Sequence, residues 1–118
     1  MLRSTEKSFP PLLTVGEVAR RFGATVATLH FYESKGLIRS LRTSGNQRRY
    51  ARGTLRRVAV IRAAQQVGLP LAEIAEALSH LPDDRAPTNE EWAAMATGWR
   101  ANLDRRIEAL ITIVNEEQ

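Results

Sequence analysis

The chain has 118 residues, of which 43% are hydrophobic and 25% charged, a composition typical of a small globular protein. It contains no cysteine, which excludes disulfides, thiolate zinc sites, cysteine nucleophiles and any iron–sulfur cluster ligated by cysteine within these residues. Apolar runs are short, and residues 1–10 lack the apolar core of a secretory signal. We therefore expect no contact with a membrane and a cytoplasmic location.

The charge is unevenly distributed along the chain. Residues 1–62 hold thirteen Lys and Arg and three acids, a net charge of +10, whereas residues 63–118 hold four Arg and ten acids, a net charge of −6. Fifteen of the seventeen basic residues are Arg, whose forked guanidinium suits phosphate and guanine. The first half therefore predicts a nucleic-acid-binding head; the alternative is a solvated surface with a bias toward arginine.

Two short helices are predicted at the start of the basic half. After a flexible polar arm, 1–11, Thr14 and Glu17 form a capping box that begins a helix, and Gly23 ends it. A second helix is expected over 26–35. Two short helices joined by a tight glycine-containing turn are a helix-turn-helix.

The periodicity then changes from helical to extended. Residues 37–42 and 47–50 predict two strands joined by the turn sequence 43–46, which together make a β-hairpin of the size of a wing. Two further amphipathic helices are expected over 54–67 and 71–81.

A linker, 82–88, separates the predicted DNA-binding head, 12–81, from one long helix, 89–118. Thr88 and Glu91 form a second capping box at the start of that helix. Its apolar side chains recur mainly at steps of three and four, as in a coiled-coil seam. The predicted dimerisation residues are Trp92, Met95, Trp99, Leu103, Ile107, Leu110 and Val114.

The long helix needs a partner for its apolar side. At roughly 43 Å it is too long to bury that side on the head, so we expect a homodimer rather than a helix folded back on its own head. The predicted fold class is mainly α: a winged helix-turn-helix DNA-binding head followed by a long antiparallel coiled-coil dimerisation helix.

This order of elements resembles the MerR family of transcription regulators, over about residues 12 to 118. The stretches that carry the resemblance are 13–19, 28–38 and 46–50. The redox-sensing, SoxR-type members are the most similar, by residues 30–38, 44–50 and 91–107. Gly53 departs from the pattern, because many relatives carry an acidic residue there.

The resemblance to the redox-sensing members implies a [2Fe–2S] cluster, held by four cysteines that follow the dimerisation helix. This chain reaches Gln118 without them, so no cofactor is expected within it. Because residues 113–118 end in mid-helix without a capping residue, we expect a longer parent chain that continues into a cysteine-rich segment.

The resemblance also implies a DNA-binding mode. The second helix enters the major groove of double-stranded promoter DNA, and the wing contacts the backbone or the minor groove. The candidate DNA ligands are Thr14, Arg20, Arg21, Ala27, Thr28, His30, Tyr32, Arg42, Gln47, Arg48 and Arg49. Thr28 either bonds a base or supports the helix cap, and Tyr32 either binds the backbone or is a packed aromatic. Tyr50 is expected to anchor the wing in the head.

Resemblance places Gly16, Arg56 and Trp92 near the cluster of the partner subunit. A cation there favours the more negative, reduced cluster, so Arg56 would help to set its potential. For Trp92 and Trp99 the alternative is packing in the coiled coil. By resemblance, the activated dimer bends and untwists the promoter so that RNA polymerase can use it.

Other classes of function fit the sequence less well. Neither His30 nor His80 has carboxylates at motif spacing and no glycine-rich phosphate loop is present, so an enzyme is not expected. A general nucleoid or RNA-binding module would use the same basic head, but the wing favours duplex DNA and the seam favours a palindrome. Within the family, the alternative is a cluster-free or truncated repressor without redox sensing.

Overall fold

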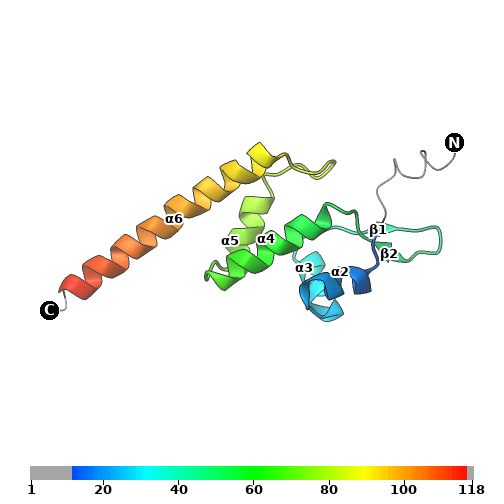
Figure 1. Ribbon diagram of the computed structural model, residues 1–118, viewed down its shortest axis with the longest axis horizontal. Helices are drawn as coiled ribbons and strands as arrows, with labels where there is room; N and C mark the ends of the chain where they lie inside the picture. The colour runs from blue at the N-terminus through cyan, green and yellow to red at the C-terminus, as the bar shows by residue number, and fades with distance from the viewer. Residues whose placement is uncertain (1–11, 117–118) are drawn as a thin grey trace. The chain divides into compact units, whose positions relative to one another are not determined.

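The computed structural model describes residues 12–116 and divides into two compact units between His80 and Leu81 (Figure 1). The first unit contains α2, α3, the two strands, α4 and α5, and the second contains α6. The arm predicted over 1–11 lies outside the described residues, as do residues 117–118.

Helix α2 covers Val15–Phe22 and begins with the predicted capping box. The Thr14 hydroxyl accepts from Glu17 N at 3.1 Å, and the Glu17 carboxylate accepts from Thr14 N at 2.8 Å. The backbone bond from Thr14 is the main reason why the pKa of Glu17 is lowered. Gly23 ends the helix at φ 62°, a left-handed conformation that glycine adopts without steric cost.

Helix α3 covers Val26–Ser34 and packs against α2. Its cap is Thr25, whose hydroxyl accepts from Thr28 N at 3.1 Å. Leu29 and Tyr32, three residues apart, are the buried side chains of this helix. The helix-turn-helix predicted from the sequence is confirmed.

A short antiparallel hairpin follows, with β1 at Leu41–Arg42 and β2 at Arg48–Arg49 (Figure 1). Leu41 pairs with Arg49 and Arg42 with Arg48. In the turn between them, Asn46 takes a left-handed conformation at φ 61°, which asparagine tolerates better than most residues. The predicted wing is present.

The first strand is shorter than the predicted range 37–42. Leu37 and Ile38 are both fully buried, whereas neighbours in a half-buried strand point to opposite faces. Leu37 N donates to Tyr32 O at 3.0 Å, so this segment completes the end of α3 instead of pairing in the wing. The sequence shows an apolar pair here but does not reveal which neighbour covers it.

Two helices complete the first unit, α4 at Thr54–Gln66 and α5 at Leu71–Leu78. They pack together, and their buried side chains include Val58, Ile61 and Ile74. The predicted end of α5 at residue 81 is wrong by three residues. Ser79 ends the helix, and its hydroxyl donates to Glu76 O at 2.6 Å, one of the side chain-to-backbone bonds by which serine competes with helix propagation.

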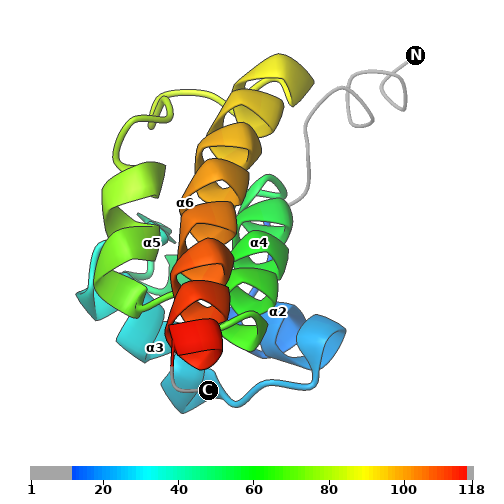
Figure 2. The ribbon, with the colours of Figure 1, turned by 90° about the vertical axis from the view of Figure 1, so that its left-hand side faces the viewer.

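The second unit is dominated by α6, an unbroken helix over Asn89–Glu116 (Figure 2). Its capping box is confirmed, because Thr88 N donates to the Glu91 carboxylate at 2.7 Å and Glu91 N donates to the Thr88 hydroxyl at 3.1 Å. Arg85 binds both oxygens of Glu91, each at 2.8 Å. These contacts define the start of the long helix.

Candidate nucleic-acid interface

The exposed side of α3 carries two of the residues predicted to contact DNA, Ala27 and His30. Ala27, His30, Phe31 and Ser34 are exposed, at the spacing of neighbours on one helix face. Leu29 and Tyr32 face the core instead. The small side chain of Ala27 and the ring of His30 therefore lie on a surface that a DNA groove could approach.

At the start of α3, Thr28 takes part in the cap. The Thr25 and Thr28 hydroxyls lie 2.9 Å apart, in addition to the bond from Thr28 N to the Thr25 hydroxyl. Of the two roles open for Thr28, the structure therefore shows cap support, and its contact with a base stays a prediction.

Tyr32 lies inside the head rather than on its surface. Its side chain is 2% exposed, and its hydroxyl donates to the Gln65 side-chain oxygen in α4 at 2.8 Å. A phosphate oxygen only accepts hydrogen bonds, and the single hydroxyl proton of Tyr32 is already in use. This geometry favours the packed-aromatic alternative over the predicted contact with the DNA backbone.

Three further predicted DNA ligands lie at the two ends of α2. Thr14 is half-buried and its hydroxyl serves the capping box, whereas Arg20 and Arg21 are exposed in the last turn. Cations at that end of a helix are also stabilised by the helix dipole, so their position alone does not assign them to DNA.

The wing arginines are held by bonds within the wing. Arg42 donates to Asn46 O at 3.2 Å, and Arg49 donates to Arg48 O at 2.8 Å and to the Gln47 side chain at 3.0 Å. Each guanidinium has five N–H donors, so these bonds leave donors for a phosphate. The hairpin therefore orders the predicted ligands Arg42, Gln47 and Arg49 before any DNA binds.

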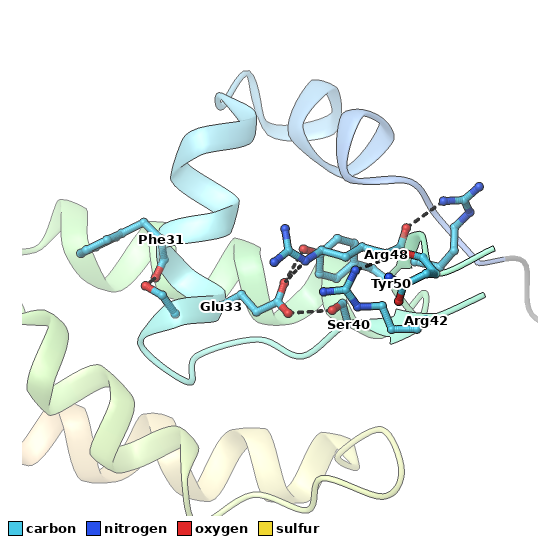
Figure 3. Close-up of polar contacts among 9 residues, drawn as sticks. Phe31, Glu33, Ser40, Arg42, Arg48 and Tyr50 are labelled. Carbon is cyan, nitrogen blue, oxygen red and sulfur yellow. Dashed lines mark hydrogen bonds and ion pairs between the residues drawn. The ribbon is translucent and has the colours of Figure 1, made fainter. Parts of the chain in front are cut away.

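A carboxylate network that the sequence did not predict joins α3 to the wing (Figure 3). Glu33 accepts the Ser40 hydroxyl proton at 2.6 Å and the Tyr50 hydroxyl proton at 2.7 Å, and it lies 3.8 Å from Arg48 Nε. Burial opposes the charged form of Glu33, but the two hydrogen bonds and the cations Arg48 and Arg42 outweigh it and lower its pKa. Burial and the contact with Glu33 raise the pKa of Tyr50.

Tyr50 is the predicted anchor of the wing, and the structure confirms this role. Its ring is fully buried, its hydroxyl is bonded to Glu33, and its backbone forms two bonds of 2.8 Å with Leu13. The base of the wing is thus attached both to α3 and to the segment before α2. One available signal for Glu33 was its position as one of only three acids in the basic half of the chain, residues 1–62.

The residues predicted near a cluster are divided between the two units. Gly16 lies in the first turn of α2 and Arg56 in the first turn of α4, whereas Trp92 is buried near the start of α6. No group of three or more His, Asp or Glu side chains within residues 12–116 is arranged to hold a metal ion. The role predicted for Gly16, Arg56 and Trp92 near a cluster therefore stays a prediction.

The side chains of the predicted seam of α6 become more exposed toward the C-terminal end of the helix. Met95, Trp99 and Leu103 are half-buried, whereas Ile107, Leu110 and Val114 are 52%, 63% and 57% exposed.

No helix in the described part of the chain has the length and hydropathy needed to cross a membrane.

Two family sequence patterns match this chain. The pattern described as "MerR HTH family regulatory protein" matches residues 13–81, and the one described as "MerR, DNA binding" matches residues 55–116. The chain belongs to the MerR family. Members of the MerR family are DNA-binding transcription regulators and not enzymes, as the sequence predicted.

Curated members of the MerR family include three similar proteins. The chain is 44% identical over 98 residues to the "HTH-type transcriptional activator SoxR homolog" of Chromobacterium violaceum, which is 83% of this chain and 66% of that protein. It is 46% identical over 65 residues to nodulation protein NolA of Bradyrhizobium elkanii, 54% of this chain and 30% of NolA. It is 42% identical over 67 residues to the mercuric resistance operon regulatory protein of Shigella flexneri, 56% of this chain and 46% of that protein.

The chain therefore spans less than two thirds of the length of these MerR relatives. Two solved structures support the fold. HiNmlR, a MerR family regulator lacking the sensor domain, bound to promoter DNA, has a TM-score of 0.61 at 22% identity, over 89% of this chain and 83% of that one. The regulator SkgA from Caulobacter crescentus has a TM-score of 0.59 at 27% identity, over 91% of this chain and 73% of that one. The mainly α fold with a helix-turn-helix head and a long C-terminal helix is confirmed.

Proposed function

We propose that this chain is the DNA-binding and dimerisation part of a redox-responsive, SoxR-like regulator in the cytoplasm. In this proposal a homodimer binds a palindromic promoter and activates transcription by distorting the DNA. The observation that carries the proposal is the 44% identity to a SoxR homolog, which extends over 98 residues, 83% of this chain.

The properties of the head support binding to duplex DNA. Residues 1–62 carry a net charge of +10, and counterion release makes such a charge favourable for phosphate binding. The major groove of DNA admits an α-helix, and α3 has an exposed face that could enter it. The wing adds arginines that are held by hydrogen bonds.

The exposed apolar side of α6 supports the homodimer. Ile107, Leu110 and Val114 follow one another at steps of three and four, and a second α6 packed antiparallel would cover them. A coil of about 42 Å then separates two heads by a distance comparable to the roughly 34 Å between successive major grooves. Two such heads suit a palindrome.

In the proposed activation step, the dimer bends and untwists the promoter so that RNA polymerase can use it. Deformation of this kind costs on the order of several kcal/mol, which depends on the DNA sequence. A signal that changes the free energy of this deformation by only a part of its total is enough to switch transcription.

The redox part of the proposal depends on residues beyond this chain. None of the 118 residues is a cysteine, and residues 12–116 contain no alternative metal-binding group, so they do not fit a [2Fe–2S] cluster. The cluster belongs to the proposal only through a cysteine-rich segment after Gln118. Gly16, Arg56 and Trp92 stay the candidates for its surroundings.

A competition gel tests the DNA-binding part of the proposal. A palindromic duplex is first selected from a random pool with the full chain, and its affinity is compared with that of a random duplex and of an RNA of equal length. We expect at least a thousandfold preference for the palindrome over the random duplex at physiological salt. Equal affinity for all three would contradict a promoter-specific regulator and support a general nucleic-acid-binding module.

Sequencing of the gene beyond Gln118 tests the redox part. We expect a reading frame that continues into several closely spaced cysteines. A stop codon directly after Gln118 contradicts the redox part and supports a cluster-free repressor. Transcription in vitro from a promoter that contains the palindrome separates the two, since the cluster-free form would repress without activating.

A further inference from the structure

Glu33 is the acid of the α3 sequence, within a half of the chain that carries a net charge of +10. A carboxylate on a helix that approaches DNA is unfavourable, because it repels the phosphates. Its side chain is 23% exposed, and both of its oxygens accept hydrogen bonds. The position of this acid therefore calls for a role that outweighs the repulsion.

The partners of Glu33 come from both limbs of the wing (Figure 3). Ser40 lies directly before β1, and Tyr50 lies directly after β2. One carboxylate on α3 thus holds the two ends of the hairpin through bonds of 2.6 Å and 2.7 Å. The wing cannot swing away from α3 unless both bonds break.

Arg48, within β2, is held to Glu33 by charge alone. Its Nε is buried 3.8 Å from the carboxylate and has no hydrogen-bond partner among the described residues, while the side chain as a whole is 37% exposed. Arginine has four further N–H donors with which it can bind a phosphate. The ion pair therefore orients the guanidinium without using its donors.

A direct role of Glu33 in reading a base fits the geometry less well. A glutamate can accept a hydrogen bond from the exocyclic amine of cytosine, but each oxygen of Glu33 already accepts a hydroxyl proton. A contact with a base would need one of these bonds to break and the wing to be released on one side.

We infer that Glu33 is a positioning residue, which fixes the wing to the recognition helix α3 and orients Arg48 toward DNA. The inference rests on the DNA-binding function proposed for the head. The carboxylate is required because it accepts from two hydroxyls and pairs with a cation at once, whereas the amide of glutamine has a single accepting oxygen and no charge.

Hydrogen exchange of the full chain without DNA is the first test. In Glu33→Gln, we expect at least tenfold faster exchange at Thr43 N–H, which bonds Gln47 O, and at Tyr50 N–H, which bonds Leu13 O. Ile74 N–H in α5 should exchange as in the unsubstituted chain. Unchanged exchange in the wing overturns the inference, and so does equal acceleration at Ile74, because it reports a loss of stability of the whole head.

Ser40→Ala is the milder variant for the same measurement. It removes one of the two donors and leaves the carboxylate, Tyr50 and Arg48 in place. We expect acceleration that is smaller than in Glu33→Gln and confined to the wing. Wing exchange that is unchanged in Ser40→Ala would contradict a clamp with two limbs.

The affinity for the selected palindrome gives the second test, in which the two roles of Glu33 predict opposite signs. If Glu33 only repels DNA, Glu33→Gln binds more tightly. If it orients Arg48, the variant binds about tenfold more weakly, and the slope of log affinity against log salt falls by about 1 in magnitude. The control Glu76→Gln removes the same charge from an exposed position in α5 and should not weaken binding.

A double substitution isolates the action through Arg48. Arg48→Gln should lose affinity by a similar factor, and Glu33→Gln added to it should cost little more. Independent, multiplicative losses would overturn the action through Arg48. If the unsubstituted chain binds no duplex, the proposed DNA-binding function fails, while hydrogen exchange still decides whether Glu33 fixes the wing.

Discussion

The base of the wing and the C-terminal half of α6 differ in where their side chains find partners. At the base of the wing, Ser40 and Tyr50 each donate a hydrogen bond to Glu33 within one unit. In α6, residues 104–116 are all exposed, although Ile107 and Leu110 are large and apolar. The polar side chains at the base of the wing thus find their partners within one chain, whereas α6 exposes the kind of surface that proteins usually cover with a partner.

This contrast separates the two requirements of a palindrome reader. Each head must hold its DNA ligands in order before binding, since ordering them during binding costs affinity. In the proposed homodimer, the distance between the two heads is set by the pairing of two copies of α6 along their apolar sides. A substitution in one region should therefore leave the other region's property intact.

The largest effect is expected in α6. Ile107→Glu combined with Leu110→Glu would place charges in the proposed dimer seam, and unpaired buried charges of this kind weaken association by roughly 100-fold or more. Sedimentation should show a monomer at micromolar concentration, with at least a comparable loss of affinity for the palindrome. Hydrogen exchange in the wing should not change.

Arg105→Glu is the control for this variant. Arg105 is exposed on α6, about 160–200° around the helix from Ile107 and Leu103, so the same type of charge is introduced away from the seam. It should stay dimeric. A dimeric Ile107→Glu, Leu110→Glu chain with unchanged affinity would contradict the seam.

The next effect is expected in the head. Tyr50→Phe keeps the buried ring and removes the hydroxyl that donates to Glu33. The free energy of unfolding should fall by about 1.5–3 kcal/mol, the range for hydrogen bonds to charged groups. Urea unfolding measures it, and an unchanged midpoint would show that Glu33 gains nothing from this bond. Dimerisation should be unaffected.

The same contrast explains what could be predicted from the sequence. Capping boxes such as Thr14 with Glu17 are local, and helical periodicity is too, so the helices follow from neighbouring residues. The Glu33 network joins residues seven and seventeen positions apart, and only the folded chain brings them together. The apolar side of α6 was predicted because it is periodic, and its exposure is what a single chain should show.

Tyr32 illustrates the limit for the candidate site. The resemblance to the family left a contact with the DNA backbone and a packed aromatic both open, and the bond to Gln65 that favours the second spans 33 positions and is invisible in the sequence. Leu37 and Ile38 illustrate the limit for the fold, because a short apolar run does not reveal whether it pairs in a strand or fills the core. In both cases the missing information is a tertiary contact, which places Leu37 and Ile38 in the core and favours the packed aromatic for Tyr32.

A smaller effect is expected from Tyr32, and it tests whether the interior of the head acts on DNA. If Tyr32 acts through Gln65, Tyr32→Phe and Gln65→Leu should each weaken palindrome binding about threefold, and the double variant should be no weaker than either. If Tyr32 binds phosphate itself, only Tyr32→Phe weakens binding. Gln66→Leu, at the neighbouring exposed position of α4, is the control.

The smallest effect is expected at the start of α6, where the pKa of Glu91 predicts how the stability of the helix start changes with pH. Its bonds from Arg85 and from Thr88 N lower the pKa of Glu91 from 4.5 to about 2. A carboxylate with a lowered pKa in the folded state stabilises that state above the pKa of the unfolded chain, and the contribution is lost as the pH falls through the folded value. The helix start is therefore expected to be favoured at neutral pH and weakened between about pH 4.5 and pH 2.

Glu91→Gln removes this dependence while it keeps an oxygen that can accept from Thr88 N. The helical signal in circular dichroism should be lower for the variant at pH 7, and the two chains should converge as the pH approaches 2. Glu90→Gln, one position earlier on the same turn, is the control and should show a weaker pH-dependent difference. A difference that persists unchanged at pH 2 would mean that Glu91 acts by its shape rather than by its charge.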